Sequence, residues 1–164
     1  MTNILLCALC YIFQIIFLIV EAKKHFKQSL VFKGLASLTF VILGILCLHK
    51  TQNKVFAGFI ITGLVLDAIA DVVFNIRFVV PQKEKASFLA GTAFFFAGHV
   101  MYLASLIPIA QLPVIVFSLA ITVAVISVAV RVLPLKRLPP AYRVAGVIYF
   151  FTICLMVCIS AGNL

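Results

Sequence analysis

The chain has 164 residues, of which 65% are hydrophobic and 10% are charged, and its formal net charge is +9. A soluble domain carries about 25% charged residues, so this composition excludes an ordinary soluble globular protein. Most of the chain consists of continuous apolar runs of roughly 20 residues, the length that an α-helix needs to cross about 30 Å of hydrocarbon. The runs do not alternate with polar residues, which favours helices as the membrane-spanning elements.

These apolar runs predict an all-α fold, a polytopic transmembrane helix bundle that forms a single domain over residues 1–164. We expect six spans, in chain order at about residues 4–20, 31–48, 55–79, 86–107, 114–132 and 141–161. The first run lacks a basic leader and a small-residue cleavage site, so we interpret it as a retained helix rather than a signal peptide.

The positions of the basic residues predict how the spans are oriented. Of the 13 Lys and Arg residues, all except Lys50 and Lys54 follow the first, third or fifth span. The loop before the last span is basic and rigid, with Pro134, Lys136 and Arg137. Because cytoplasmic loops are enriched in Lys and Arg, we expect both termini outside the cytoplasm. The positive charge therefore indicates topology and does not indicate a nucleic-acid partner.

The third expected span carries two carboxylates inside its apolar run. Asp67 and Asp71 are four residues apart and share one helical face, which Asn75 extends by a further turn. The other acidic residues, Glu21 and Glu84, lie at the ends of apolar runs. A carboxylate at the bilayer centre costs about 2.5–3.5 kcal/mol on insertion scales. The pair therefore predicts a polar cavity, a partner or a shared proton, as acid–base chemistry requires.

The fourth expected span places His99 and Tyr102 on one face, with Phe95 further toward the expected cytoplasmic side. Counting about 1.5 Å per residue from the span ends puts His99 at a depth similar to that of Asp67. Antiparallel neighbours could bring the two faces together. The plainer interpretation is a polar cluster that only holds helices together.

Two further expectations concern a metal site and Lys33. A metal site formed by His99, Asp67 and Asp71 has suitable ligands, but the sequence shows no zinc signature, and we expect neither a metal nor a cofactor. Lys33 is expected in the first turn of the second span, where its side chain could reach the membrane surface.

Three stretches of the sequence resemble the YhhN family of membrane proteins, whose characterised members are lysoplasmalogenases. They are FKGL at Phe32–Leu35, GLVLDAIADVVF at Gly63–Phe74 and FLAGTAFFFAGHVMYLASL at Phe88–Leu106. The resemblance covers about residues 30–110 and is expected to fade afterwards. The residues that match the family pattern are Lys33, Asp71, Phe95, His99 and Tyr102.

The sequence also departs from the family pattern. Asp67 stands where the family has Ser, Ala70 stands where it has Gly, and Gly34 stands where Pro is common. The family usually has about eight spans and a second functional Asp on a late helix. The resemblance therefore implies a relative that is shortened at the C-terminus, in which Asp67 substitutes for that carboxylate or activity is lost.

The resemblance implies a hydrolase of a bacterial cell membrane that cleaves the vinyl-ether bond of a lysophospholipid. The implied partners are the lipid bilayer and this substrate, and a homo-oligomer is left open. Asp71 is the expected acid–base residue, with Asp67 as its partner carboxylate and with His99 and Tyr102 orienting groups or sharing protons. The residues expected to bind substrate are Lys33, Asn75 and Phe95.

Two alternatives stay open at the level of the sequence. A small proton-coupled transporter would also use intramembrane Asp and His residues, although the expected spans contain no interrupting Pro and the halves show no symmetry. A non-catalytic membrane scaffold, a degenerate member of the family, is the other alternative.

Overall fold

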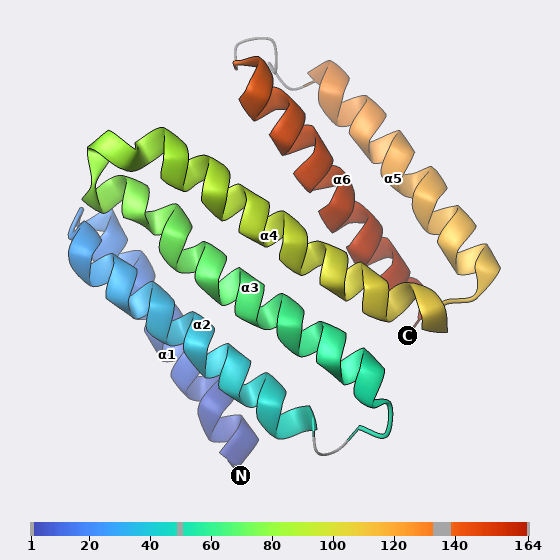
Figure 1. Cartoon of the computed structure of the whole chain (residues 1–164), viewed down its shortest axis with the longest axis horizontal. Coiled ribbons are helices and arrows are strands. Elements are labelled where there is room, and N and C mark those ends of the chain that lie inside the picture. Colours follow the sequence, from blue (N-terminus) through green and yellow to red (C-terminus); the bar gives the residue numbers. More distant parts are fainter. Residues whose placement is uncertain (1, 49–50, 133–138, 164) are drawn as a thin grey trace. The chain divides into compact units, whose positions relative to one another are not determined.

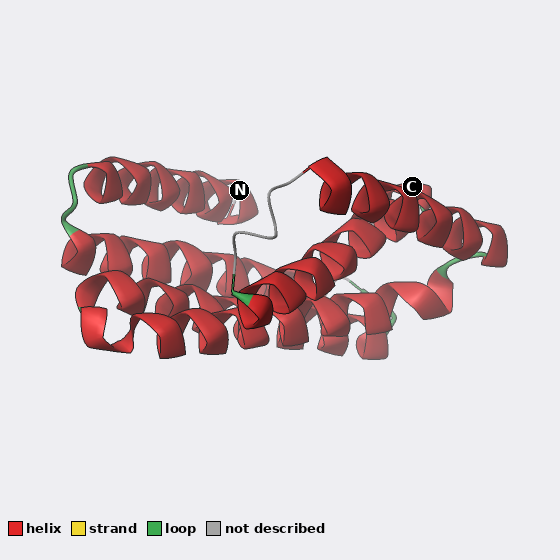
Figure 2. Cartoon of the chain, turned by 90° about the horizontal axis from the view of Figure 1, so that it is seen from above, coloured by secondary structure: helices red, strands yellow, loops and turns green. Residues whose placement is uncertain are grey.

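The computed structural model describes residues 2–48, 51–132 and 139–163, and its long elements are all helices (Figures 1 and 2). Within these residues there are six long α-helices, two short 3₁₀ helices and no strand, which confirms the predicted all-α fold with six apolar spans. The elements are α1 (Thr2–Ala22), α2 (Phe26–Leu48), α3 (Lys54–Val79), η1 (Pro81–Lys83), α4 (Glu84–Leu106), η2 (Ile107–Ile109), α5 (Leu112–Val132) and α6 (Pro140–Gly162).

The pattern of burial is that of a protein in lipid. Each of six segments, 20 to 29 residues long, is apolar enough to cross a membrane. The exposed large side chains along them are mostly Ile, Leu, Val and Phe. Small or weakly polar residues allow helices to approach closely in a membrane, and many of the buried residues are of this kind, among them Ala36, Ala57, Ala70, Ser29, Thr39, Ser118 and Thr122. The chain is an integral, multi-pass membrane protein.

The membrane side of each terminus stays a prediction. Some of the residues on which it depends lie outside the described part of the chain, namely Lys50, Pro134, Lys136 and Arg137. The other helix boundaries agree with expectation to within a few residues, with one exception. The second helix begins at Phe26, five residues before the predicted start. The charge of Lys27 predicts a loop at this position, but a polar side chain at a helix end can reach the membrane surface while its backbone is helical.

The chain divides into two compact units, one up to Gly98 and one from His99 onward. In the first unit α1 packs on α2 and α2 packs on α3. Figure 1 shows α2, α3 and the first part of α4 side by side. In the second unit α5 packs on α6. The single domain expected from the sequence stays a prediction.

The contact between α3 and α4 depends on glycine. A Cβ atom on Gly91 would lie 2.7 Å from Phe74 Cβ and 2.9 Å from Phe74 Cα. Gly98 lies seven residues after Gly91 on α4, and a Cβ atom there would collide with the carboxylate of Asp67. Asp67 lies seven residues before Phe74 on α3. The matching intervals show that the two helices are antiparallel. Their backbones approach so closely because these two positions carry no side chain.

We expect Gly91→Ala to lower the free energy of unfolding by about 1–3 kcal/mol, because the backbone of α3 must move to admit the methyl group. Gly58→Ala is the matched control, since a Cβ atom there meets nothing within 4 Å. It should be neutral or slightly stabilising, as alanine favours helix over glycine. Unfolding by sodium dodecyl sulfate in mixed micelles, followed by circular dichroism, measures both. Equal stability of the two variants would contradict the close approach.

Candidate functional site

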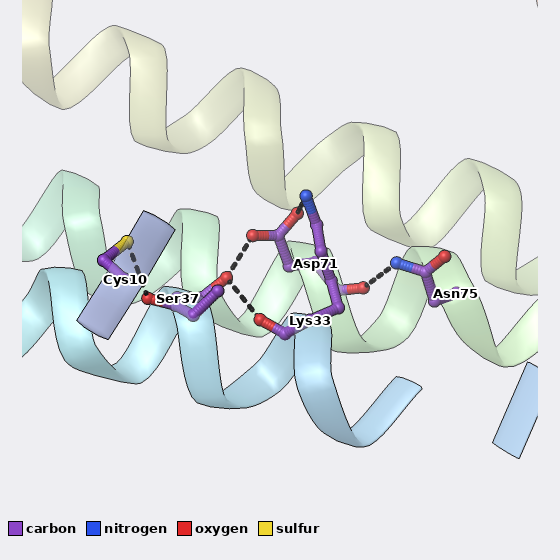
Figure 3. Close-up of polar contacts among 6 residues, drawn as sticks. Cys10, Lys33, Ser37, Asp71 and Asn75 are labelled. Carbon is purple, nitrogen blue, oxygen red and sulfur yellow. Dashed lines mark hydrogen bonds and ion pairs between the residues drawn. The ribbon is translucent and has the colours of Figure 1, made fainter. Parts of the chain in front are cut away.

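The carboxylate of Asp71 on α3 is held by two side chains of α2 (Figure 3). Its Oδ1 atom lies 3.3 Å from the ammonium nitrogen of Lys33, and its Oδ2 atom is hydrogen-bonded to the hydroxyl of Ser37. Lys33 and Ser37 are one turn apart on α2 and therefore reach the carboxylate from the same helical face. Only 21% of the Lys33 side chain and 18% of the Asp71 side chain are exposed. The two opposite charges thus neutralise each other inside an apolar span.

Ser37 has two acceptors within reach of its single hydroxyl proton. Besides Asp71, the backbone carbonyl oxygen of Lys33 lies 3.1 Å from Ser37 Oγ. When Asp71 is ionised, the hydroxyl can donate to the carboxylate. When Asp71 is protonated, its O–H can donate to Ser37 Oγ while the hydroxyl donates to the carbonyl. Ser37 can therefore form a hydrogen bond with Asp71 whether or not the carboxyl group carries a proton.

The structure places Lys33 deeper than the sequence predicts. The prediction that Lys33 lies in the first turn of the span is wrong, because α2 begins at Phe26, seven residues before Lys33. At 1.5 Å per residue, Lys33 lies about 10 Å along the helix axis from that start. Its ammonium nitrogen is 5.0 Å from the ring centroid of Phe17 on α1. Lys33 is thus directed toward Asp71 and an aromatic ring between the helices.

Asn75 and Cys10 lie beside this pair (Figure 3). The side-chain amide of Asn75, which is buried, donates a hydrogen bond of 2.8 Å to the backbone carbonyl of Asp71. From α1, the thiol of Cys10 donates to the carbonyl of Ala36 at 3.6 Å. Asn75 therefore supports the backbone at Asp71, and a contact of Asn75 with substrate stays a prediction.

Asp67 faces a different neighbour from Asp71. Its carboxylate fills the space that a side chain at Gly98 on α4 would take, and one of its oxygens is buried. Asp71 instead meets Lys33 and Ser37 on α2. The two carboxylates thus lie four residues apart on the same helix, but they contact different neighbouring helices. A proton shared between them stays a prediction.

Phe95 belongs to an aromatic cluster between α3 and α4. Its ring meets that of Phe74 edge-on at 6.1 Å, and the ring of Phe88 lies 5.4 Å from that of Phe74. The guanidinium of Arg77 lies 3.9 Å from the centroid of Phe74 and 4.4 Å from that of Phe78. Cation–π contacts of this kind stabilise a charge that has left water.

His99 and Tyr102 lie in the second unit, and a third ring joins them there. The ring of His99 is 5.8 Å from that of Tyr102, as their spacing on one helical face predicts, and 5.3 Å from that of Tyr149 on α6. Both contacts are edge-on. The sequence analysis missed Tyr149, because nothing in α6 distinguishes it from a tyrosine that faces lipid. The predicted meeting of His99 with the aspartates stays a prediction.

A sequence model of the YhhN family matches residues 28–164. The chain belongs to the YhhN family. Comparison with curated proteins and with solved structures gave no significant match. The YhhN match includes Lys33, Ser37 and Asp71, and it continues past residue 110, where the resemblance was expected to fade.

In the described part of this YhhN chain, no three His, Cys, Asp or Glu residues are grouped so that they could hold a metal ion. The groups that the structure brings to Asp71 are an amine and a hydroxyl. Ser37 was missed by the sequence analysis, although its position one turn after Lys33 is a signal that could have found it. This donor set stabilises one carboxylate by an ion pair and a hydrogen bond.

We expect Lys33→Met and Asp71→Leu each to destabilise the protein, because each leaves one charge without its partner in the membrane. The loss should be about 1–3 kcal/mol, below the 3–5 kcal/mol of fully buried pairs, since both side chains are partly exposed. The double variant Lys33→Met/Asp71→Leu removes both charges and should lose less than the sum. Unfolding in mixed micelles gives the three free energies, and strictly additive losses would contradict the pairing.

Proposed function

We propose that this YhhN protein hydrolyses the vinyl-ether bond of a lysoplasmalogen in a bacterial cell membrane, releasing a fatty aldehyde and a glycerophospho-alcohol. The observation that carries the proposal is the Asp71 carboxylate inside the span, with Lys33 at one oxygen and Ser37 at the other. Ionisable groups at this depth are costly, and in membrane proteins they are functional by default. Family membership supports the same reaction, since it is the one that the resemblance implies.

The reaction requires an acid that protonates carbon. Asp71 first takes up a proton and then transfers it to the vinyl carbon β to the ether oxygen, which restores the ionised Asp71 of the pair with Lys33 and leaves an oxocarbenium ion at the α carbon. Water adds to the α carbon and releases a proton that returns to Asp71. The resulting hemiacetal breaks at its C–O bond to give the aldehyde and the alcohol. The ammonium of Lys33 and the hydroxyl of Ser37 stabilise Asp71 while it is ionised.

An apolar cavity next to this pair suits the alkenyl chain of the substrate. It has a volume of about 430 Å³ and is lined by residues of α2 and α3. Gly34 and Val72, the chain neighbours of Lys33 and Asp71, are among them, together with Leu38 and Ile69. Single-chain lipids bind in largely apolar sites with few polar groups, and this cavity is lined by chain neighbours of Lys33 and Asp71 rather than by these two residues themselves.

The other predicted site residues complete the proposal. Asp67 is the partner carboxylate that activates water or stabilises the oxocarbenium ion, and His99 and Tyr102 orient the reacting groups. The residues proposed to contact substrate are Lys33, Asn75 and Phe95.

Purified protein in detergent should release fatty aldehyde from lysoplasmalogen, and Asp71→Asn should reduce the rate at least about a hundredfold, as expected for a general acid–base residue. Glu84→Gln is the matched control, because it also neutralises one carboxylate, at the start of α4 outside the apolar run. It should retain the wild-type rate. A folded wild-type protein that releases no aldehyde would reject the hydrolase, and proton flux into liposomes would then test the transporter.

The role of Asp67 can be tested separately with Asp67→Ser, which restores the residue of the family pattern. If Asp67 is the second carboxylate, this variant should lose at least about tenfold in rate, a modest share of an acid–base contribution. Asp67→Glu, which keeps the charge, should be less affected unless the close contact with Gly98 excludes the longer side chain. A wild-type rate for Asp67→Ser would remove Asp67 from the mechanism while leaving Asp71 in place.

A further inference from the structure

A second cavity opens where the turn between α1 and α2 meets the end of α3. It has a volume of about 430 Å³. Its polar lining comes from Lys24, His25 and Lys27, and its apolar lining includes Phe26 and Phe78, whose rings stack at 5.4 Å. Of the described residues that line it, none is acidic. Such a cavity, cationic on one side and aromatic on the other, suits an anion attached to an apolar body.

The backbone of this turn is held in an unusual conformation. Lys24 has φ 61°, and in the described part of the chain it is the one non-glycine residue with a positive φ. Its N–H donates to the Glu21 carbonyl at 2.8 Å, and the His25 N–H donates to the Val20 carbonyl at 3.1 Å. This is the hydrogen-bond pattern of a Schellman helix end, where glycine or asparagine is preferred at the position of Lys24. A lysine in this strained backbone conformation is a reason to look for a function at the turn.

One further cation, Arg77, lies near the aromatic lining of the cavity, and the carboxylates of Glu84 and Glu21 act on it. The guanidinium of Arg77 lies over the ring of Phe78 at 4.4 Å, so the aromatic lining is itself next to a cation. The first turn of α2, which carries Lys27, contains no acidic residue. The partial positive charge of a helix N-terminus therefore adds to that of the lysines. The cavity lies at the ends of membrane spans, at the level where lipid headgroups are found.

We infer that this cavity binds the phosphate group of an anionic phospholipid headgroup. Lys24, His25 and Lys27 contact the phosphate, and the Phe26–Phe78 pair packs against the glycerol and the first methylenes of the lipid. Lys33 lies about 10 Å further along α2 than this end of the helix, so the site is separate from the Asp71 cluster. The inference does not depend on the proposed hydrolase activity.

The test uses the full chain purified in detergent, with phosphatidylglycerol and phosphatidylcholine of equal chain length added in equal amounts. Native mass spectrometry measures the ratio of the two lipids retained. We expect a preference for phosphatidylglycerol that falls about fivefold for each lysine removed, in Lys24→Asn and in Lys27→Gln. The control, Lys83→Gln/Lys85→Gln, removes two charges next to α3 and at the start of α4, outside the cavity lining, and should keep the preference.

The possible outcomes separate the inference from general charge effects. An equal loss in the control would show attraction by surface charge alone and would overturn the site, as would the absence of any preference in wild type. Added glycerol 3-phosphate should not displace the lipid at millimolar concentration. If it binds while phosphatidylglycerol shows no preference, the lipid assignment is wrong and the cavity takes a soluble phosphate compound.

A change in stability distinguishes binding from folding. Asparagine adopts a positive φ more readily than lysine, so Lys24→Asn should raise the melting temperature while it weakens lipid retention. Opposite changes in these two quantities are not expected from a variant that simply misfolds. Lys27→Gln, at an ordinary helical position, should weaken retention with the melting temperature unchanged. If both variants retain phosphatidylglycerol like wild type, these lysines do not form the site.

Discussion

A carboxylate that enters a membrane must either meet a cation or keep its proton, and the pair formed by Lys33 and Asp71 satisfies this requirement between α2 and α3. Both helices carry apolar side chains around most of their circumference, so hydrophobicity alone does not fix how they are rotated about their axes. The ion pair does, because only a narrow range of rotations brings the ammonium and the carboxylate together. The hydroxyl of Ser37 on α2, which is hydrogen-bonded to the Asp71 carboxylate, restricts the same rotation further.

The central helix of the first unit therefore has two different kinds of contact. Toward α2, α3 is attached by charge and hydrogen bonds, at Asp71. Toward α4, it is attached by close backbone packing, at Gly91 and Gly98. Asp67 stands on this second side, where its carboxylate lies against the backbone of α4 at Gly98. One helix thus carries two acidic groups into two distinct surroundings, which is how otherwise similar carboxylates come to serve different chemical roles.

The sequence predicts the helices well, because the length and continuity of an apolar run are local properties. It also identifies Asp71, because a charge inside such a run is unusual by itself. It does not find Ser37 or Tyr149, whose contacts with Asp71 and His99 depend on which helix faces meet, and apolar helices carry no periodic pattern that specifies those faces. The late predicted start of α2 has another cause: polar residues such as Lys27 can occupy the last helical turns before water.

The neutrality of the pair between α2 and α3 also determines how the protein responds to an electric field. Moving one unit charge through 100 mV changes the energy by about 2.3 kcal/mol, so a lone intramembrane charge makes a protein sensitive to voltage. Lys33 and Asp71 carry opposite charges only 3.3 Å apart. While Asp71 is ionised, the membrane potential therefore exerts almost no net force on the pair, and protonation of Asp71 would make the site sensitive to voltage.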